Sequence, residues 1–155
     1  MSTLLAETPR STAGTPSLYE ADETGWLEQV ARCIVEGRFD DIDYPHLEEY
    51  MTDTAKRDRR EVWSRLVILL AHWLKWEFQP ERRSTSWQRT IHDQHRELTK
   101  IFESETLRNH AHDELDDAYG HAVTDAALET GLPTSAFPAA NPRTLEEWLA
   151  LGFDP

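Results

Sequence analysis

The sequence predicts an all-α fold, an up-and-down bundle of four to five main helices with a short C-terminal helix. Three observations predict it: apolar residues recur at spacings of three and four along most of the chain, strict alternation of apolar and polar residues is rare, and only six of the 155 residues are glycine. A chain of this length can bury roughly two-thirds of the surface that its unfolded form exposes. It therefore needs no metal or disulfide to hold a core.

The first residues differ in composition from the rest of the chain. Residues 1–17 are rich in Ser, Thr and Pro and lack the charged start and apolar run of a signal peptide, so we expect a disordered tail there. We expect residues 18–155 to form a single helical bundle domain. The longest apolar run, 66–74, is about half as long as a membrane-spanning helix. Together with a single cysteine, Cys33, this favours a cytoplasmic protein without a membrane span.

Helix signals mark the first half of the chain. The first helix is predicted over 22–36 and ends at Gly37, since glycine tolerates the left-handed conformation that often closes a helix. Its apolar side carries Trp26, Leu27, Val30, Cys33 and Ile34. Asp43 is expected to cap the second helix. No proline or glycine occurs between 47 and 78, so the second and third helices are either continuous or broken near 52–54, where helix propensity is weakest.

The strongest signal is a central helix over 61–78. Its apolar residues form two adjacent stripes, Val62, Leu66, Leu69, Trp73 and Trp76 beside Trp63, Val67, Leu70 and Leu74. Two stripes side by side make a wide apolar face, so this helix should be contacted from several sides. Pro80 is expected to end it, because the residue before a proline disfavours helix.

Two long helices and one short helix are predicted after Pro80. The first is capped at position 84 or 85 and runs to about 102; the second covers 107–130 and ends at Gly131. Small residues line the inner face of the second (Ala111, Leu115, Ala118, Ala122 and Ala126), which permits close helix approach. Thr144 and Glu147 form a capping-box pattern that predicts the short C-terminal helix.

Charge is distributed unevenly along the chain. The net charge is −13, with −9 in residues 1–55, +5 in 56–100 and −9 in 101–155. A basic segment can bind nucleic acid. However, the acidic arms can neutralise it within the fold, and an acidic protein is repelled by phosphate at long range. Nucleic-acid binding through 56–100 is therefore a disfavoured alternative.

Polar side chains on the central helix are the first candidate site. Arg65, His72 and Gln79 share one helical face, with Lys75 at its edge. His72 is the only polar residue within the apolar run 66–74. A histidine there can act as a general base or as a ligand. Alternatively, it can be held neutral by one buried hydrogen bond to the neighbouring helix, which is the structural role that we favour.

The turn after the central helix is the second candidate. Arg82 and Arg83 lie beside hydroxyl side chains at a helix start, where they could hold a phosphate or carboxylate, and Trp87 could provide a stacking wall or a cation–π contact. The favoured alternative is that the arginines bridge to the acidic first and last helices. The candidate ligand- or partner-binding residues are Arg65, His72, Lys75, Gln79, Arg82, Arg83 and Trp87.

Catalytic and metal-binding motifs are missing from the sequence. It contains no Glu-x-x-His pair, HEXXH, paired CXXC, Gly-rich phosphate loop or G-x-S-x-G elbow. His92 and His95 can meet on one helical face, as can Glu114, Asp117 and His121, but solvated or salt-bridged roles explain them more simply. We therefore expect no catalytic residue, metal or cofactor.

Three separated segments carry a family resemblance. They are YEADETGWLEQVARCIVEGRFDDID near the start, LLAHWLKWEFQPERRSTSWQRTIHDQHRE in the middle and NPRTLEEWL near the end. Together they resemble the bacterial domain of unknown function 29 family over about residues 18–153. The resemblance implies an all-α up-and-down bundle. It implies no catalytic residue, cofactor or partner, because the family has no established activity.

The leading hypothesis is a non-enzymatic helical domain that binds a protein partner or a second copy of itself. It would present the 82–87 turn or an exposed helical face. The first alternative is a small-molecule or anion-binding enzyme with a site around His72 and that turn. The second is nucleic-acid binding through the basic segment.

Overall fold

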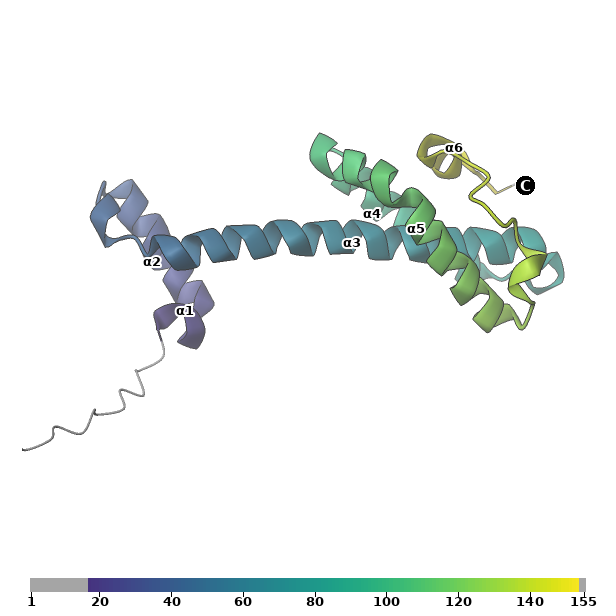
Figure 1. The fold of residues 1–155 in the computed structure, drawn as a ribbon, viewed down its shortest axis with the longest axis horizontal. Coiled ribbons are helices and arrows are strands. Elements are labelled where there is room, and N and C mark those ends of the chain that lie inside the picture. The colour runs from purple at the N-terminus through teal and green to yellow at the C-terminus, as the bar shows by residue number, and fades with distance from the viewer. Residues whose placement is uncertain (1–16, 154–155) are drawn as a thin grey trace, which may run out of the picture. The chain divides into compact units, whose positions relative to one another are not determined.

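The computed structural model describes residues 17–153, and within this range the chain is helical with no β-strand. Four of its helices are long or of medium length, and a short helix follows them (Figure 1). The predicted all-α class is therefore confirmed. Residues 1–16 of the predicted tail lie outside the described residues.

The chain divides into two compact units, within residues 1–51 and 52–155. A single domain over 18–155 stays a prediction. The first unit contains α1 (Leu18–Ala21), α2 (Glu23–Val35), the 3₁₀ turn η1 (Phe39–Asp41) and the first residues of α3 (Tyr44–Phe78). Its small core consists of Trp26, Val30, Cys33 and Ile42.

Local signals fix the ends of α2. At the start, the carboxylate of Asp22 accepts a hydrogen bond from the backbone N–H of Gly25 at 3.0 Å. At the end, Gly37 adopts a positive φ of 71°, as predicted from its position. Arg38 then holds the following turn, because its guanidinium contacts the carboxylates of Glu36 and Asp41 at 2.7 Å each.

Helix α3 is continuous from Tyr44 to Phe78 (Figure 1). Of the two alternatives left open by the sequence, continuity is therefore the correct one. The weak helix formers at 52–54 each cost only a few tenths of a kcal/mol relative to good ones. Without proline or glycine, that cost does not break the helix.

The second unit contains the rest of α3, η2 (Pro80–Arg82), α4 (Thr85–Ile101), α5 (Glu105–Thr130), η3 (Thr134–Ala136) and α6 (Leu145–Ala150). Its core draws on α3, α4, α5 and α6 together. Both predicted stripes of the central helix lie in it, fully buried except for the half-buried Trp63 and Trp76. The small residues predicted on the inner face of α5 are buried as well.

The predicted caps of the second unit are observed. Ser84 caps α4, and its hydroxyl accepts a hydrogen bond from the N–H of Trp87 at 3.3 Å. Gly131 closes α5 with a φ of 74°. Thr144 and Glu147 form the reciprocal capping box of α6, with hydrogen bonds of 3.2 and 2.8 Å. The short α6 is thereby fixed at its start.

Two glycines of the second unit are expected to respond oppositely to the same substitution. Gly131→Ala should lower the free energy of unfolding by about 1 kcal/mol, because alanine is strained at positive φ. Gly120→Ala should raise it by about 0.5–1 kcal/mol, since Gly120 is in the interior of α5 with open space around its Cα. Urea denaturation of both variants measures the two changes in the free energy of unfolding. If both changes had the same sign, the different backbone roles of Gly131 and Gly120 would be contradicted.

Candidate functional site

Lys75 is the most unusual polar residue of the second unit, because only 1% of its surface is exposed. It comes from the last turn of α3. Its ammonium pairs with the carboxylate of Glu129 on α5 and lies 5.0 Å from the ring centroid of Trp87 on α4. The lysine thus connects three helices with one ion pair and one cation–π contact.

His72 lies one turn before Lys75 on α3. Its Nδ1–H donates a 2.8 Å hydrogen bond to the carbonyl of Ile68 in the same helix. Burial lowers the pKa of His72, and the positive charge of Lys75 lowers it further, while the Ile68 hydrogen bond and the charge of Glu129 act in the opposite direction. Burial therefore favours the neutral form of His72. The predicted hydrogen bond to the neighbouring helix is not the one observed, because the ring bonds the carbonyl one turn earlier in α3 itself.

The lowered pKa of His72 gives a testable pH dependence. Its folded pKa lies below the unfolded value of about 6.5, so the unfolded chain takes up a proton first as the pH falls. Stability should therefore drop below about pH 6.5 and level off below the folded pKa. His72→Asn keeps a donor for Ile68 and should remove this part of the drop. Urea denaturation at pH 7.5 and 5.5 checks it; identical pH slopes for both proteins would contradict it.

Gln79 joins the ends of α3 and α5. Its side chain is buried, and its Nε2 donates a 3.5 Å hydrogen bond to the carbonyl of Thr130. Its Oε1 has no hydrogen-bond partner within the described part of the chain. Thr130 is itself fixed, because its hydroxyl donates to the carbonyl of Ala126 at 2.6 Å.

The three candidate arginines make different contacts. Arg65 contacts Glu61 at 2.8 Å and donates to the amide oxygen of Gln94 at 3.1 Å. Arg83 donates to the backbone carbonyl of Trp76 at 2.8 Å, with its guanidinium 4.8 Å from that residue's indole centroid.

The exposed Arg82 forms no ion pair with any residue in 17–153. The structure therefore gathers His72, Lys75, Gln79 and Trp87 where α3 meets the end of α5 and the start of α4. It gives each of the three arginines a different environment.

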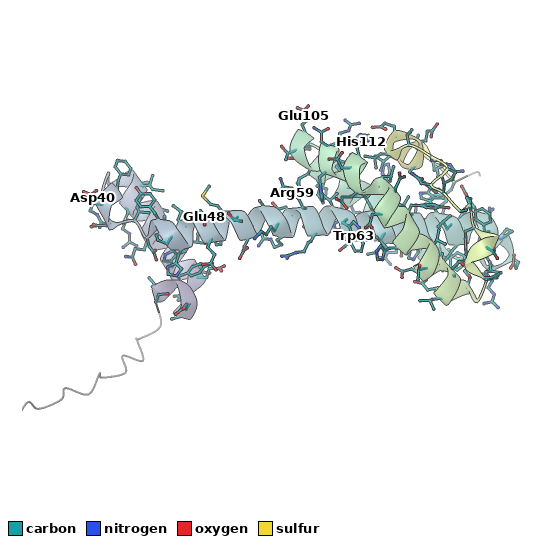
Figure 2. All side chains as sticks on the ribbon, in the orientation of Figure 1. Asp40, Glu48, Arg59, Trp63, Glu105 and His112 are labelled. Atoms are coloured by element: carbon teal, nitrogen blue, oxygen red, sulfur yellow. The ribbon has the colours of Figure 1, made fainter. Side chains whose placement is uncertain are left out.

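Four cavities are described, and His72 lines none of them. The first unit holds one of about 130 Å³. The second unit has an open hollow of about 240 Å³ lined by Arg59, Arg60, Trp63, His110 and Glu114, of which Arg59 and Trp63 extend from α3 in Figure 2. Two larger depressions, of about 530 and 480 Å³, lie beside the loop that leads to α6. A shared cavity for His72 and an arginine is not among these four.

Two arginine pairs of segment 56–100 lie far apart within the second unit. Arg59 and Arg60 lie on α3 about five helical turns before its end, while Arg82 and Arg83 follow that end. At 1.5 Å per residue, roughly 30 Å of helix separates them. This separation weakens the case for one continuous nucleic-acid-binding face.

Two of the histidines and carboxylates named from the sequence make hydrogen bonds within the fold. His95 on α4 bonds the carbonyl of Leu149 on α6 at 3.0 Å, and Asp117 accepts a 2.7 Å hydrogen bond from the indole N–H of Trp63. Among residues 17–153, no group of three His, Cys, Asp or Glu side chains could hold a metal ion. In the same range, no helix is both long enough and apolar enough to cross a membrane.

Four large apolar side chains are exposed on the first unit, at the end of α2, in η1 and at the start of α3. They are Ile34, Val35, Phe39 and Tyr44, whose exposed fractions are 50, 86, 55 and 54%; Asp40, labelled in Figure 2, belongs to η1. We call these four residues the N-terminal apolar surface. Periodicity had placed Ile34 on the inner side of the helix, but α2 ends one residue later and leaves it half exposed.

Comparison with known proteins adds one finding. A family model described as "Domain of unknown function DUF29" matches residues 18–154, nearly the whole chain. The resemblance noted from the three sequence segments is thereby confirmed. Neither the curated proteins nor the solved structures include a match.

Proposed function

We propose that this chain, which belongs to the DUF29 family of domains of unknown function, is a non-enzymatic protein-interaction domain of the cytoplasm. The observation that carries the proposal is the N-terminal apolar surface. Four large apolar side chains, each at least half exposed, come from one short stretch of chain. Clustered exposed apolar groups are typical of interaction sites, whereas apolar residues exposed singly need no explanation.

Charge narrows the chemistry of the partner. Residues 17–51 contain ten Asp or Glu and two Arg, giving a net charge of −8. The N-terminal apolar surface is therefore part of a strongly acidic unit. The complementary partner is an amphipathic helix with an apolar stripe flanked by Lys and Arg, since such a helix satisfies both the apolar and the electrostatic requirement.

The candidate residues of the second unit support a structural role over an enzymatic one. His72 uses its Nδ1–H within its own helix, and Lys75 is enclosed by Glu129 and Trp87. A general base needs a free path to a substrate proton, and the enclosed lysine has none. We therefore assign these second-unit residues a role in holding the helices together.

Photo-crosslinking in the native cells tests the proposal. A benzoylphenylalanine is placed at Val35 or Phe39 of the full chain, and at Leu128 as a matched control, because Leu128 is a large apolar residue that is 79% exposed on α5. We expect positions 35 and 39 to capture one and the same protein, through a basic amphipathic helix, and position 128 to capture none.

Binding to the captured protein is then measured with purified components. The double variant Val35→Ser/Phe39→Ser should weaken binding about tenfold or more, while Leu128→Ser should leave it unchanged. A higher salt concentration should also weaken binding of the unaltered chain, since salt screens the attraction between the acidic unit and the basic helix. If the captured protein is a second copy of this chain, the proposed basic partner is wrong and the surface serves self-association. Equal capture from all three positions would contradict the proposal.

A further inference from the structure

The open hollow of about 240 Å³ on the second unit has walls of opposite charge. Arg59, Arg60 and Trp63 line it from α3, and His110 and Glu114 line it from α5; Arg59 and Trp63 are labelled in Figure 2. Residues three or four positions apart share one face of a helix, so each wall is formed by one helical face. Because the hollow is smaller than the pockets that hold drug-sized molecules, a ligand that fits it is small.

The charged groups of the two walls do not neutralise one another. Arg59 and Arg60 are exposed and Glu114 is half-buried, and none of the three forms an ion pair or a side-chain hydrogen bond with any residue in 17–153. By contrast, Arg65, further along α3, is paired with Glu61 at 2.8 Å. The hollow therefore presents two guanidinium groups and one carboxylate that are all available to a ligand.

Trp63 adds a fixed aromatic ring to the hollow. Its indole N–H donates a 2.7 Å hydrogen bond to the carboxylate of Asp117 on α5. The ring of His121, one turn later on α5, packs edge to face against it at a centroid distance of 5.0 Å. These two contacts hold the indole in place before a ligand arrives, which lowers the entropic cost of binding. The charge of Asp117 also makes the α5 side of the hollow more negative.

We propose that this hollow binds a small zwitterion, either a free amino acid or a dipeptide with an apolar side chain. Its carboxylate pairs with the guanidinium groups of Arg59 and Arg60, its ammonium group pairs with Glu114, and its side chain lies against the Trp63 ring. A purely anionic ligand is repelled by Glu114, and a purely cationic one by the two arginines. The inference does not depend on a protein binding the N-terminal apolar surface.

Titration of the full chain with phenylalanine and with glycylphenylalanine, followed by NMR, tests this site. The chain has six tryptophans, so six indole N–H signals are expected, and the Trp63→Phe variant assigns the relevant one by its loss. Two controls keep the phenyl ring: 3-phenylpropionate lacks the ammonium group, and phenylalaninamide lacks the carboxylate. Inorganic phosphate is the control for a phosphate site.

We expect a saturable shift of the Trp63 signal with one or both zwitterions, with a dissociation constant in roughly the millimolar range for ligands of this size. The tighter of the two shows whether the ligand is an amino acid or a dipeptide. Tighter binding of 3-phenylpropionate, phenylalaninamide or phosphate than of both zwitterions would overturn the proposal in favour of a carboxylate, cation or phosphate site. The absence of any saturable shift would overturn it too, since the hollow then holds only water.

Substitutions separate the two charges of the ligand. The double variant Arg59→Gln/Arg60→Gln should weaken binding of the zwitterion about fivefold, the size expected for exposed ion pairs. Arg57→Gln is the matched control, because Arg57 is on the same helix but does not line the hollow, and it should leave binding unchanged. Equal affinities of the double variant and the unaltered chain would place the ligand elsewhere and overturn the proposal.

Glu114→Gln should change the affinities of two ligands in opposite directions. Binding of the zwitterion should weaken about twofold to fivefold, because its ammonium group loses the counter-ion. Binding of 3-phenylpropionate should become tighter, because the repulsion between its carboxylate and Glu114 is removed. A substitution that merely distorted the hollow would weaken both ligands, and that result would overturn the assignment of Glu114 to the ammonium group.

Discussion

Lys75→Ala is expected to lower the free energy of unfolding by about 3 kcal/mol. The substitution removes a long aliphatic stem from a site where only 1% of the residue is exposed. Truncation of a large buried side chain to alanine costs about 2–5 kcal/mol through lost contacts and the void left behind. The freed carboxylate of Glu129 adds little, because 53% of that side chain is already exposed and water can solvate it.

Two companion variants show whether the charge or the stem of Lys75 stabilises the fold. Lys75→Met keeps the stem and should stay within about 1 kcal/mol of the unaltered chain, since apolar replacements of buried ion pairs are often neutral or stabilising. Glu129→Ala leaves the ammonium enclosed without its counter-ion and should cost about 2–3 kcal/mol. Urea denaturation measures all three. A loss for Lys75→Met as large as for Lys75→Ala would show that the charge itself is required.

The helical framework could be predicted because its determinants are local. The two stripes over 62–76 define a buried face by spacing alone, and Gly37, Gly131 and Thr144 mark helix ends through properties of single residues or short motifs. These signals lie within one helix or one turn. For the same reason, the predicted ends of α2, α4 and α5 agree with the observed ones within a few residues.

The environment of the candidate site could not be predicted in the same way. Lys75 is buried because Glu129, 54 residues later in the chain, provides its counter-ion, and no local pattern links the two. Its proximity to His72, Gln79 and Trp87 likewise follows from how α3, α4 and α5 pack. From the sequence alone, Lys75 was therefore assigned to the edge of the polar face of the central helix, although it is buried.

The first unit shows a second limit of sequence reasoning. Periodicity correctly assigned Trp26 and Cys33 to a core, but it does not report whether the core is filled. The cavity beside Trp26 depends on the path of the chain through η1 and into α3. The exposure of Val35 similarly depends on where α2 ends and how the chain continues after it.

Trp148→Ala is expected to lower the free energy of unfolding by about 4 kcal/mol and to release α6. Trp148 is 1% exposed; its indole donates to the side-chain oxygen of Asn141 at 2.9 Å and lies 4.7 Å from the guanidinium of Arg143. Deletion of a buried tryptophan side chain costs about 3–5 kcal/mol. A helix of six residues is not stable alone, so the loss of its anchor should open it.

Trp148→Phe separates the packing of the ring from its hydrogen bond. The Asn141 oxygen keeps a second donor, the backbone N–H of Arg143 at 3.3 Å, so loss of the indole N–H leaves no buried acceptor unpaired. The phenylalanine variant should therefore cost only about 1–2 kcal/mol. Urea denaturation gives both values, and hydrogen exchange of the amides in 145–150 should accelerate strongly only in the alanine variant. If exchange accelerated equally in both, α6 would be held by the indole hydrogen bond, and packing of the aromatic ring would be secondary.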